Sequence, residues 1–449
     1  MDIAVERHPL TVLLARRCWT AEAFLGKVAV RQRARGFGGM AARKEKVSRW
    51  VAGTAPRIHT QLAMADVLGV QECDVYARGW PDWLLAAFDD DRTVLESPWT
   101  PAGSVKVLDD VGGPVDRRAF LIASTSALAG IVAQWATAQS AQASLAGRRR
   151  IGHEVADQLD LRLDALRHLD DQIGSAQVYD AATAELRLIA SLLKDTTHTE
   201  QVGRRLYAGA AEASRLAGWC AYDTGHNADA ERHYVAALRA AASAGNDTVG
   251  ASTLAFWANL RYAGGDPRGA LDLIDGALKS SRRINSPRVK ALLHARRARA
   301  HSLAGEAQAA YQAVDAAFAA YDHAGAASGD LPSMYWVTAG ELHMFAASTS
   351  LSLGEPRRAL EFFDLALNGH DPYDSQQEAR GTAIYLARHA EAHLALGDLD
   401  AAVEVAEQVL RLMGGVESAR GSSALDELRG GLADHKDVPI VRGFLDLTA

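Results

Sequence analysis

The stretch 218–230, GWCAYDTGHNADA, decides the fold, because its spacing recurs at 258–270 (ANLRYAGGDPRGA), at 298–310 (ARAHSLAGEAQAA) and twice further on. Each copy starts with a small residue, has a glycine followed by a polar residue at its eighth place and ends in alanine. The small residues are Gly218, Ala258, Ala298, Ala347 and Ala390, the glycines Gly225, Gly265, Gly305, Gly354 and Gly397, and the alanines Ala230, Ala270, Ala310, Ala359 and Ala402. We expect each glycine to end a helix in the left-handed conformation that a side chain would penalise, and the small residues to let the next helix approach closely.

Later positions of the pattern also repeat. Twelve residues after the glycines lie Ala237, Ala277, Ala317, Ala366 and Val409, and the next residues are Leu238, Leu278, Phe318, Leu367 and Leu410. We expect the large residue to fill the gap between successive helix pairs. One pair cannot bury its apolar face alone, so the pattern predicts a stack of pairs.

This pattern resembles the tetratricopeptide repeat family, although the glycines are 40, 40, 49 and 43 residues apart, against about 34 in the family. The resemblance implies a right-handed α-solenoid of helix pairs that are longer than the consensus. We place it over residues 150–449, with degenerate pairs over 150–215 and a cap over 416–449. No stretch has a convincing strand pattern, so the whole chain is expected to be all-α.

The net charge of -7 over 449 residues argues against a protein that binds nucleic acid, because phosphates attract positive charge. The distribution of charge reverses this argument. Residues 1–75 contain 12 basic and 7 acidic side chains, a net charge of +5, so the other 374 residues carry -12. The N-terminal part is therefore the candidate for contact with nucleic acid.

A short motif near the N-terminus agrees with this charge. Val47-Ser48-Arg49-Trp50, followed by Gly53 and Pro56, resembles the recognition helix and exit turn of the phage-repressor-like (XRE) helix-turn-helix family. The resemblance covers 9–76 and implies a DNA-binding domain over 1–76. Thr20 is expected to cap the second helix and Gly69 to stop the fourth. Residues 30–42 replace the family's tight turn, so we expect a longer second helix and a Gly-rich connection.

Val47 and Trp50 are expected to be buried, which leaves Lys44, Glu45, Ser48 and Arg49 on the outer face of the third helix. The resemblance implies that Lys44, Glu45 and Arg49 contact base edges, with Arg49 suited to guanine and Glu45 to cytosine. Arg43, Lys46 and Arg57 are better placed for phosphates. A loop along the phosphate backbone would suit Arg31, Arg33 and Arg35, which at every second position cannot share one helix face.

Residues 77–116 are rich in Trp, Pro, Asp and Gly without a period, which predicts a linker or wrapping segment. Residues 117–149 are expected to form a connecting helix. Arg117-Arg118 before the mildly apolar run 122–136 imitates a twin-arginine export signal. The run lies far from the N-terminus and contains polar residues, so a helix with one face docked on the neighbouring domain is the favoured interpretation.

The inner wall of a repeat stack is the natural place for a ligand. Six and three residues before the glycines lie the candidate effector-binding residues Trp219, Tyr222, Asn259, Tyr262 and Arg299. Such a line suits an extended peptide or a small molecule, because Asn pairs with amides, Arg with carboxylates and aromatic rings stack. The alternative is an ordinary half-buried groove without a ligand.

Other chemistry finds little support. The three cysteines, Cys18, Cys73 and Cys220, are far apart, which fits a reducing cytoplasm and gives no disulfide framework. His389 and His393 lie one helical turn apart, but Glu391 stands midway between them, so the metalloprotease motif is absent and histidines on a solvated helix are expected. No catalytic motif is found. We expect no enzyme activity, cofactor, metal or membrane segment.

Two hypotheses remain. The first is a cytoplasmic, sequence-specific transcriptional regulator that binds double-stranded promoter DNA as a homodimer, with a repeat domain for dimerisation, for a peptide or small-molecule effector, or for both. The fusion resembles actinobacterial regulators of this kind, which implies control of development or secondary metabolism. The second is a scaffold that binds only proteins.

Overall fold

The computed structural model describes residues 8–17, 19–87, 92–113, 125–142, 149–279, 283–324, 329–368, 379–413 and 418–448. The regular secondary structure of this part is helical except for two short parallel strands, β1 (Arg149–Arg150) and β2 (Thr196–Thr197). The prediction of an all-α fold is therefore confirmed. None of the described helices is long and apolar enough to cross a bilayer.

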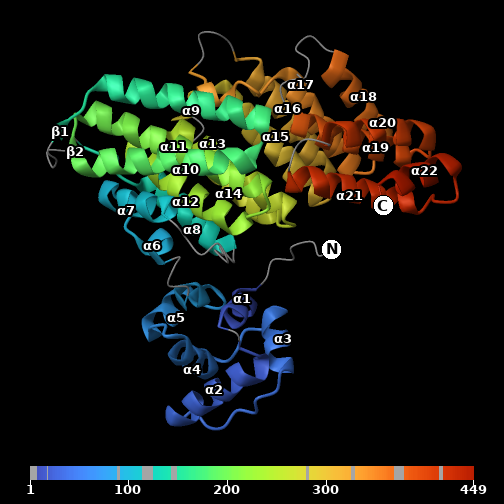
Figure 1. Cartoon of the computed structure of the whole chain (residues 1–449). Helices are drawn as coiled ribbons and strands as arrows, with labels where there is room; N and C mark the ends of the chain where they lie inside the picture. The colour runs from blue at the N-terminus through green and yellow to red at the C-terminus, as the bar shows by residue number, and fades with distance from the viewer. Residues whose placement is uncertain are drawn as a thin grey trace.

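The N-terminal helices form a small bundle, drawn in blue at the lower end of Figure 1. They are α1 (Pro9–Arg16), α2 (Ala21–Ala34), α3 (Glu45–Val51), α4 (Ile58–Leu68) and α5 (Glu72–Arg78), followed by the 3-10 turn η1 (Asp82–Ala87). Thr20 caps α2 by accepting a hydrogen bond from the amide of Ala23 at 3.1 Å. Gly69 ends α4 with φ +79°. Both positions act as their residue types predict.

The rest of the chain consists mainly of consecutive helix pairs, which pack side by side in Figure 1. The pairs are α9 (His153–Ile173) with α10 (Ser175–Asp195), α11 (Glu200–Asp223) with α12 (Asn227–Ala244), α13 (Asp247–Ala263) with α14 (Pro267–Lys279), α15 (Pro287–Leu303) with α16 (Ala307–Tyr321), α17 (Ala339–Ser352) with α18 (Pro356–Asn368), α19 (Ala379–Ala395) with α20 (Leu399–Met413), and α21 (Ala419–Ala433) with α22 (Pro439–Leu447).

The turn glycines have the conformation that their spacing predicts. Gly225, Gly265, Gly305, Gly354 and Gly397 have φ between +75° and +91°. The small residues before them and the alanines after them lie where paired helices meet. A Cβ on Gly218 would lie 2.8 Å from the Tyr234 ring, and Ala230 is fully buried. These small side chains set the close approach of α11 and α12.

The expected role of the large residue at the later offset is wrong for part of the stack. Leu238 is buried, but Leu367 is 41% exposed. The residue just before it is the one that is buried in every pair, from Ala237 to Val409. A helix turns by about 100° per residue, so burial of the first position does not by itself bring the next one into the same contact.

The segment expected to be a linker is largely helical and held to the pairs. It contains α6 (Arg92–Glu96) and α7 (Pro101–Gly112), and α7 packs on α10 and α12. Arg239 of α12 is only 1% exposed and donates hydrogen bonds to the backbone carbonyls of Leu95 (3.2 Å) and Ser97 (2.7 Å). The Trp and Pro residues of this segment break any period, which is why the sequence pattern hides its helices.

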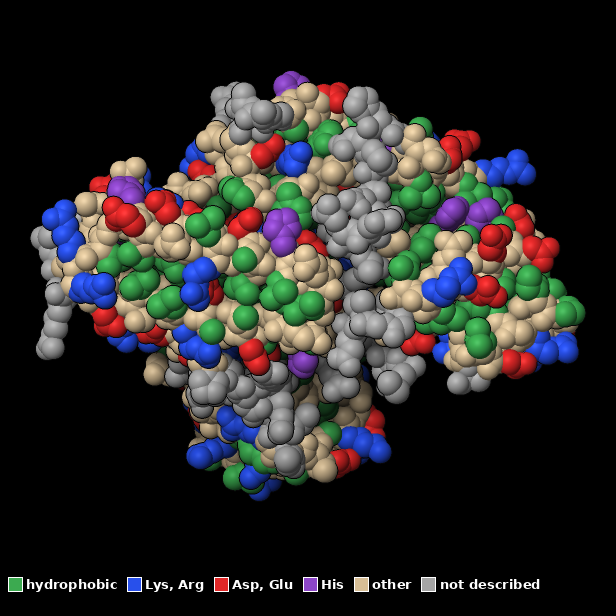
Figure 2. Space-filling view, turned by 45° about the horizontal axis from the view of Figure 1, so that its top comes forward, with side chains coloured by type: hydrophobic (Ala, Val, Ile, Leu, Met, Phe, Trp, Pro, Cys, Tyr) green, Lys and Arg blue, Asp and Glu red, His purple; other side chains and the backbone are tan. Residues whose placement is uncertain are grey.

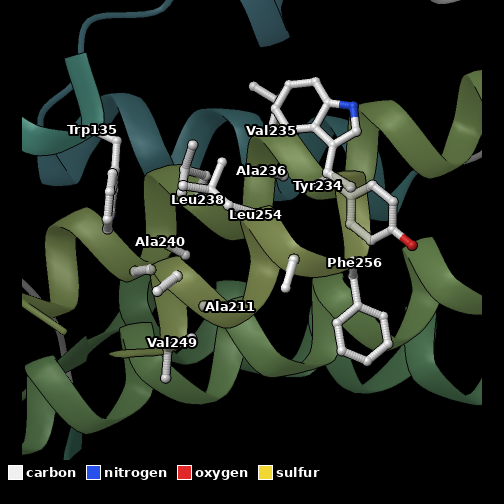
Figure 3. Packing of buried hydrophobic residues seen from close by; sticks show 14 of the residues in the cluster. Trp135, Ala211, Tyr234, Val235, Ala236, Leu238, Ala240, Val249, Leu254 and Phe256 are labelled. Atoms are coloured by element: carbon white, nitrogen blue, oxygen red, sulfur yellow. The ribbon is translucent and has the colours of Figure 1, made fainter. Parts of the chain in front are cut away.

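Helix α8 (Thr125–Thr137) docks one face on α12 and α14, as expected for the apolar run. Leu128, Val132 and Trp135 are buried there. Figure 3 shows Trp135 beside the buried layer that contains Leu238 of α12 and Leu254 of α13. Arg117 and Arg118 lie outside the described residues, as does Cys18.

Candidate nucleic-acid interface and ligand cavity

Helix α3 presents a polar face to solvent. Val47 and Trp50 are buried in the core of the N-terminal bundle, with Phe24, Val28 and Leu62 in the same cluster. Lys44, Glu45, Ser48 and Arg49 are exposed on the opposite side, as are Arg43 and Arg57, while Lys46 is half-buried. In the described part of the chain, none of these cations has an ion pair. Their charge is therefore available to a partner.

The arginines at 31, 33 and 35 divide into two groups. Arg31 and Arg33 lie exposed in the last turn of α2, not in a loop as expected. Arg35 follows the helix and pairs with Asp66 at 2.6 Å and with Glu72 at 3.0 Å. It fastens the end of α2 to α4 and α5, so its charge is already matched within the bundle.

Residues 35–44 connect α2 to α3. Gly36 and Gly38 have φ of +75° and +83°, and the Phe37 ring stacks on His59 of α4 with 4.5 Å between ring centroids. The longer second helix and the Gly-rich connection agree with the sequence expectation. The stacked ring fixes the connection to α4. Figure 2 shows Lys and Arg side chains on the projecting lower end of the molecule, which is this bundle.

A cavity of about 610 Å³ lies among the first helices of the pairs. All five candidate effector-binding residues line it: Trp219, Tyr222, Asn259, Tyr262 and Arg299. Glu391, at the matching place in α19, does not. The lining comes mainly from α9, α11, α13, α15, α17, α19 and α21, from the start of α12, and from the 3-10 turn η4 (Pro332–Met334) and the residues after it.

The sequence pattern missed a second row of lining residues. Nine residues before the turn glycines lie Leu216, Phe256, Arg296, Phe345 and Arg388, and all five line the cavity. They stand one helical turn before the row of Trp219 and Asn259 and share its face. The signal was present in the repeat spacing, but the types at this offset differ too much to draw attention.

Aromatic rings and guanidinium groups form one wall of the cavity. Trp219 donates a hydrogen bond to Asp170 of α9 at 3.1 Å and meets the Phe256 ring edge-on at 5.4 Å. The Arg420 guanidinium of α21 lies 4.7 Å from the Trp219 ring, and that of Arg215 lies 4.4 Å from the Phe256 ring. Such cation–π contacts hold the rings in place.

The deep end of the cavity concentrates positive charge. Arg299 donates a hydrogen bond to the carbonyl of Ser348 at 2.5 Å, and Arg296 donates one to the Tyr262 hydroxyl at 2.6 Å. Burial, followed by the charge of Arg388, lowers the pKa of Arg299 to about 9. Nearby, Glu341 accepts a hydrogen bond from Tyr385 at 2.5 Å, and its burial raises its pKa to about 7.

Several buried polar atoms at the cavity lack a hydrogen-bond partner among the described residues, and two of them belong to Asn259 and Ser348. Asn259 is 3% exposed and its Nδ2 is unpaired, and the Oγ of Ser348 is likewise buried and unpaired. An unpaired buried donor costs about 1–3 kcal/mol. A ligand in the cavity would supply the missing acceptor.

The histidine pair is half-buried and not fully solvated as expected. His389 packs on Phe363 with 5.0 Å between ring centroids, and its burial and the charge of His393 lower its pKa to about 4. No group of three or more His, Cys, Asp or Glu side chains in the described residues could hold a metal ion.

No protein-family model matches this chain, and no curated protein is detectably similar to it.

Proposed function

We propose that the protein is a DNA-binding transcriptional regulator whose helix pairs respond to an effector. In this proposal the N-terminal bundle is a helix-turn-helix domain of the XRE type, and the pairs form a right-handed tetratricopeptide-like solenoid. The regulator acts in the cytoplasm as a homodimer. Two recognition helices then enter major grooves about one helical turn apart.

The polar face of α3 carries the proposal. Buried Val47 and Trp50 fix the rotation of the helix, so Lys44, Glu45, Ser48 and Arg49 face solvent together. Arg49 is suited to the O6 and N7 atoms of guanine and Glu45 to the amino group of cytosine. Arg31, Arg33, Arg43, Lys46 and Arg57 are then phosphate contacts. Arg35 is left out of this set, because Asp66 and Glu72 already hold it.

The effector part of the proposal depends on the cavity. A volume of about 610 Å³ lies within the range of ligand sites, about 300–1,000 Å³. Its walls come from many helix pairs, so an occupant would favour one arrangement of the pairs. An effector shifts the regulator only as far as it binds one arrangement more tightly than the other.

Genomic fragments captured by the purified full chain provide the test. We expect one enriched sequence, and an oligonucleotide that carries it should lose affinity steeply as salt rises, because each phosphate contact releases counterions. Arg49→Ala should abolish the preference for this sequence over a scrambled one. Arg411→Ala is the matched control, since Arg411 is an exposed arginine of α20.

A scaffold that binds only proteins predicts a different result. Captured fragments would then show no enriched sequence, and Arg49→Ala and Arg411→Ala would behave alike. Either result would overturn the proposal that the protein is a DNA-binding regulator.

A further inference from the structure

The lining of the cavity has a surplus of positive charge in an otherwise acidic body. Its charged side chains are Arg167, Arg215, Arg296, Arg299, Arg388 and Arg420 against Asp170, Asp171, Glu341 and Glu427. Three of these arginines are paired with carboxylates just behind the lining: Arg167 and Arg215 with Glu212, and Arg420 with Asp223. The other three, Arg296, Arg299 and Arg388, lie near Glu341 and Glu391, and burial raises the pKa of both carboxyl groups, so the deep end is short of ionised counter-charges.

We propose that this cavity binds one compact aromatic carboxylate, with its carboxylate at Arg296, Arg388 and Asn259 and its ring against Trp219 and Phe256. The inference deepens the effector part of the proposed function and rests on it.

The carboxylate end is defined by groups with free donors. Arg296 uses one terminal nitrogen for Tyr262, but its buried Nε has no partner among the described residues. Arg388 is half-buried on α19 and forms no hydrogen bond within the described part of the chain. Asn259 offers its unpaired Nδ2. Arginine binds carboxylates through two parallel hydrogen bonds, and such charge-assisted bonds are strong where water is excluded.

Repulsion between like charges indicates the same site for the carboxylate. Arg296 and Arg388 both lower the pKa of Arg299 through their charges, in addition to its burial. An anion bound among these three groups would relieve the repulsion. Glu341 is a weak counter-ion, since burial keeps it partly protonated at neutral pH.

The ring end is apolar and rigid. Trp219, Phe256 and Trp336 meet edge-on, with centroid separations of 5.4 Å and 6.0 Å. Arg215 and Arg420 hold Phe256 and Trp219 from other sides. Flat aromatic rings prefer offset-stacked or edge-on neighbours, so the wall suits a planar ligand.

The position of α21 favours a compact ligand over an extended peptide. Arg420 lies against Trp219 and Tyr222, and Ser418 donates a hydrogen bond to Asp223 at the end of α11. The last pair therefore covers the part of the inner wall along which a peptide would have to continue. Leu303 is 44% exposed and Ser423 and Glu427 are also exposed, which places the mouth of the cavity beside α15 and α21.

Calorimetric titration of the full chain without DNA tests this inference separately from DNA binding. The probes are benzoate, naphthalene-2-carboxylate and quinoline-4-carboxylate, each with its primary amide, and acetate as an anion without a ring. We expect at least one carboxylate to bind once per chain, at least tenfold tighter than its amide and than acetate. Arg388→Met should weaken it at least tenfold, whereas Arg411→Met should leave it unchanged.

Asn259→Leu removes the unpaired donor and keeps the volume, so it should also weaken binding of the carboxylate. Circular dichroism confirms that each variant is folded. Three results overturn the inference: no carboxylate binds, the amides bind as tightly, or Arg388→Met binds like the parent chain. If one of these results is found but the chain still binds a specific DNA sequence, the proposed regulator stands without this ligand. If the chain binds the carboxylate but no specific DNA sequence, the proposed regulator fails and the ligand class of the cavity stands.

Discussion

Asp223, the last residue of α11, accepts a hydrogen bond from the hydroxyl of Ser418 at 3.1 Å, although 195 positions separate them. Arg420 reaches the same carboxylate at 3.5 Å. Asp223 is fully buried, so this contact is shielded from water. It joins the last helix pair to the second one and holds α21 over the aromatic wall of the cavity.

Ser418→Ala should therefore loosen the C-terminal pair. The hydroxyl also caps α21 through the amide of Gly421 at 3.1 Å. Loss of the cap and of a bond to a carboxylate should cost about 2 kcal/mol. Hydrogen exchange should quicken in α21 and α22. Ser422→Ala, at an exposed position of the same helix, should leave the exchange unchanged; equal exchange in both variants would show that the contact does not hold the pair.

A second prediction concerns the turn glycines. Gly305 has φ +75°, and no described atom lies within 4 Å of the place that a Cβ would take, so Gly305→Ala meets only backbone strain. We expect it to lower the free energy of unfolding by about 1–2 kcal/mol, measured by urea denaturation. Gly130→Ala is the control inside α8, where φ is ordinary and space is also open. It should raise stability by about 0.5–1 kcal/mol, and a loss there would contradict the argument.

The helix pairs could be predicted from the sequence because few other residues can replace a glycine in a left-handed turn or an alanine at a close contact between helices. Gly225 and Ala230 mark where a helix must end and where two helices must touch, and both do so. The row from Trp219 to Arg299 could likewise be predicted to share one face, and its residues line one cavity. Side-chain pairing could not be predicted, because it depends on residues far apart in the sequence: Arg35 meets Asp66, and Ser418 meets Asp223. The helices at 92–112 were hidden by their irregular composition.

The different surroundings of two arginines give a third prediction. Arg35→Ala should lower the stability of the N-terminal bundle by about 0.5–1 kcal/mol, because a surface pair with Asp66 and Glu72 is lost. Arg33→Ala should leave stability unchanged and weaken DNA binding, with the slope of log affinity against log salt falling by about 1. Urea denaturation and fluorescence anisotropy separate the two effects. If Arg33→Ala lowers stability and Arg35→Ala weakens DNA binding instead, then Arg35, and not Arg33, contacts the phosphates.

The fourth prediction concerns the pH dependence of stability. Burial raises the pKa of Glu341 to about 7, despite the hydrogen bond from Tyr385 and the charges of Arg296 and Arg420. In the unfolded chain its pKa is about 4.5. The folded state then holds more protons on Glu341 than the unfolded state between these values, so the contribution of Glu341 to stability is greatest below pH 4.5 and is lost as pH rises through about 7.

Glu341→Gln should remove this dependence, because the amide keeps the shape and cannot ionise. Between pH 5 and pH 8 the parent chain should lose about 2–3 kcal/mol of unfolding free energy relative to the variant. Urea denaturation at several pH values, followed by tryptophan fluorescence, measures the difference. Glu361→Gln, an exposed position on α18, should follow the parent chain. Parallel curves for the parent and Glu341→Gln would mean that Glu341 is ionised in the folded protein, which would also leave the arginines of the cavity with a full counter-charge.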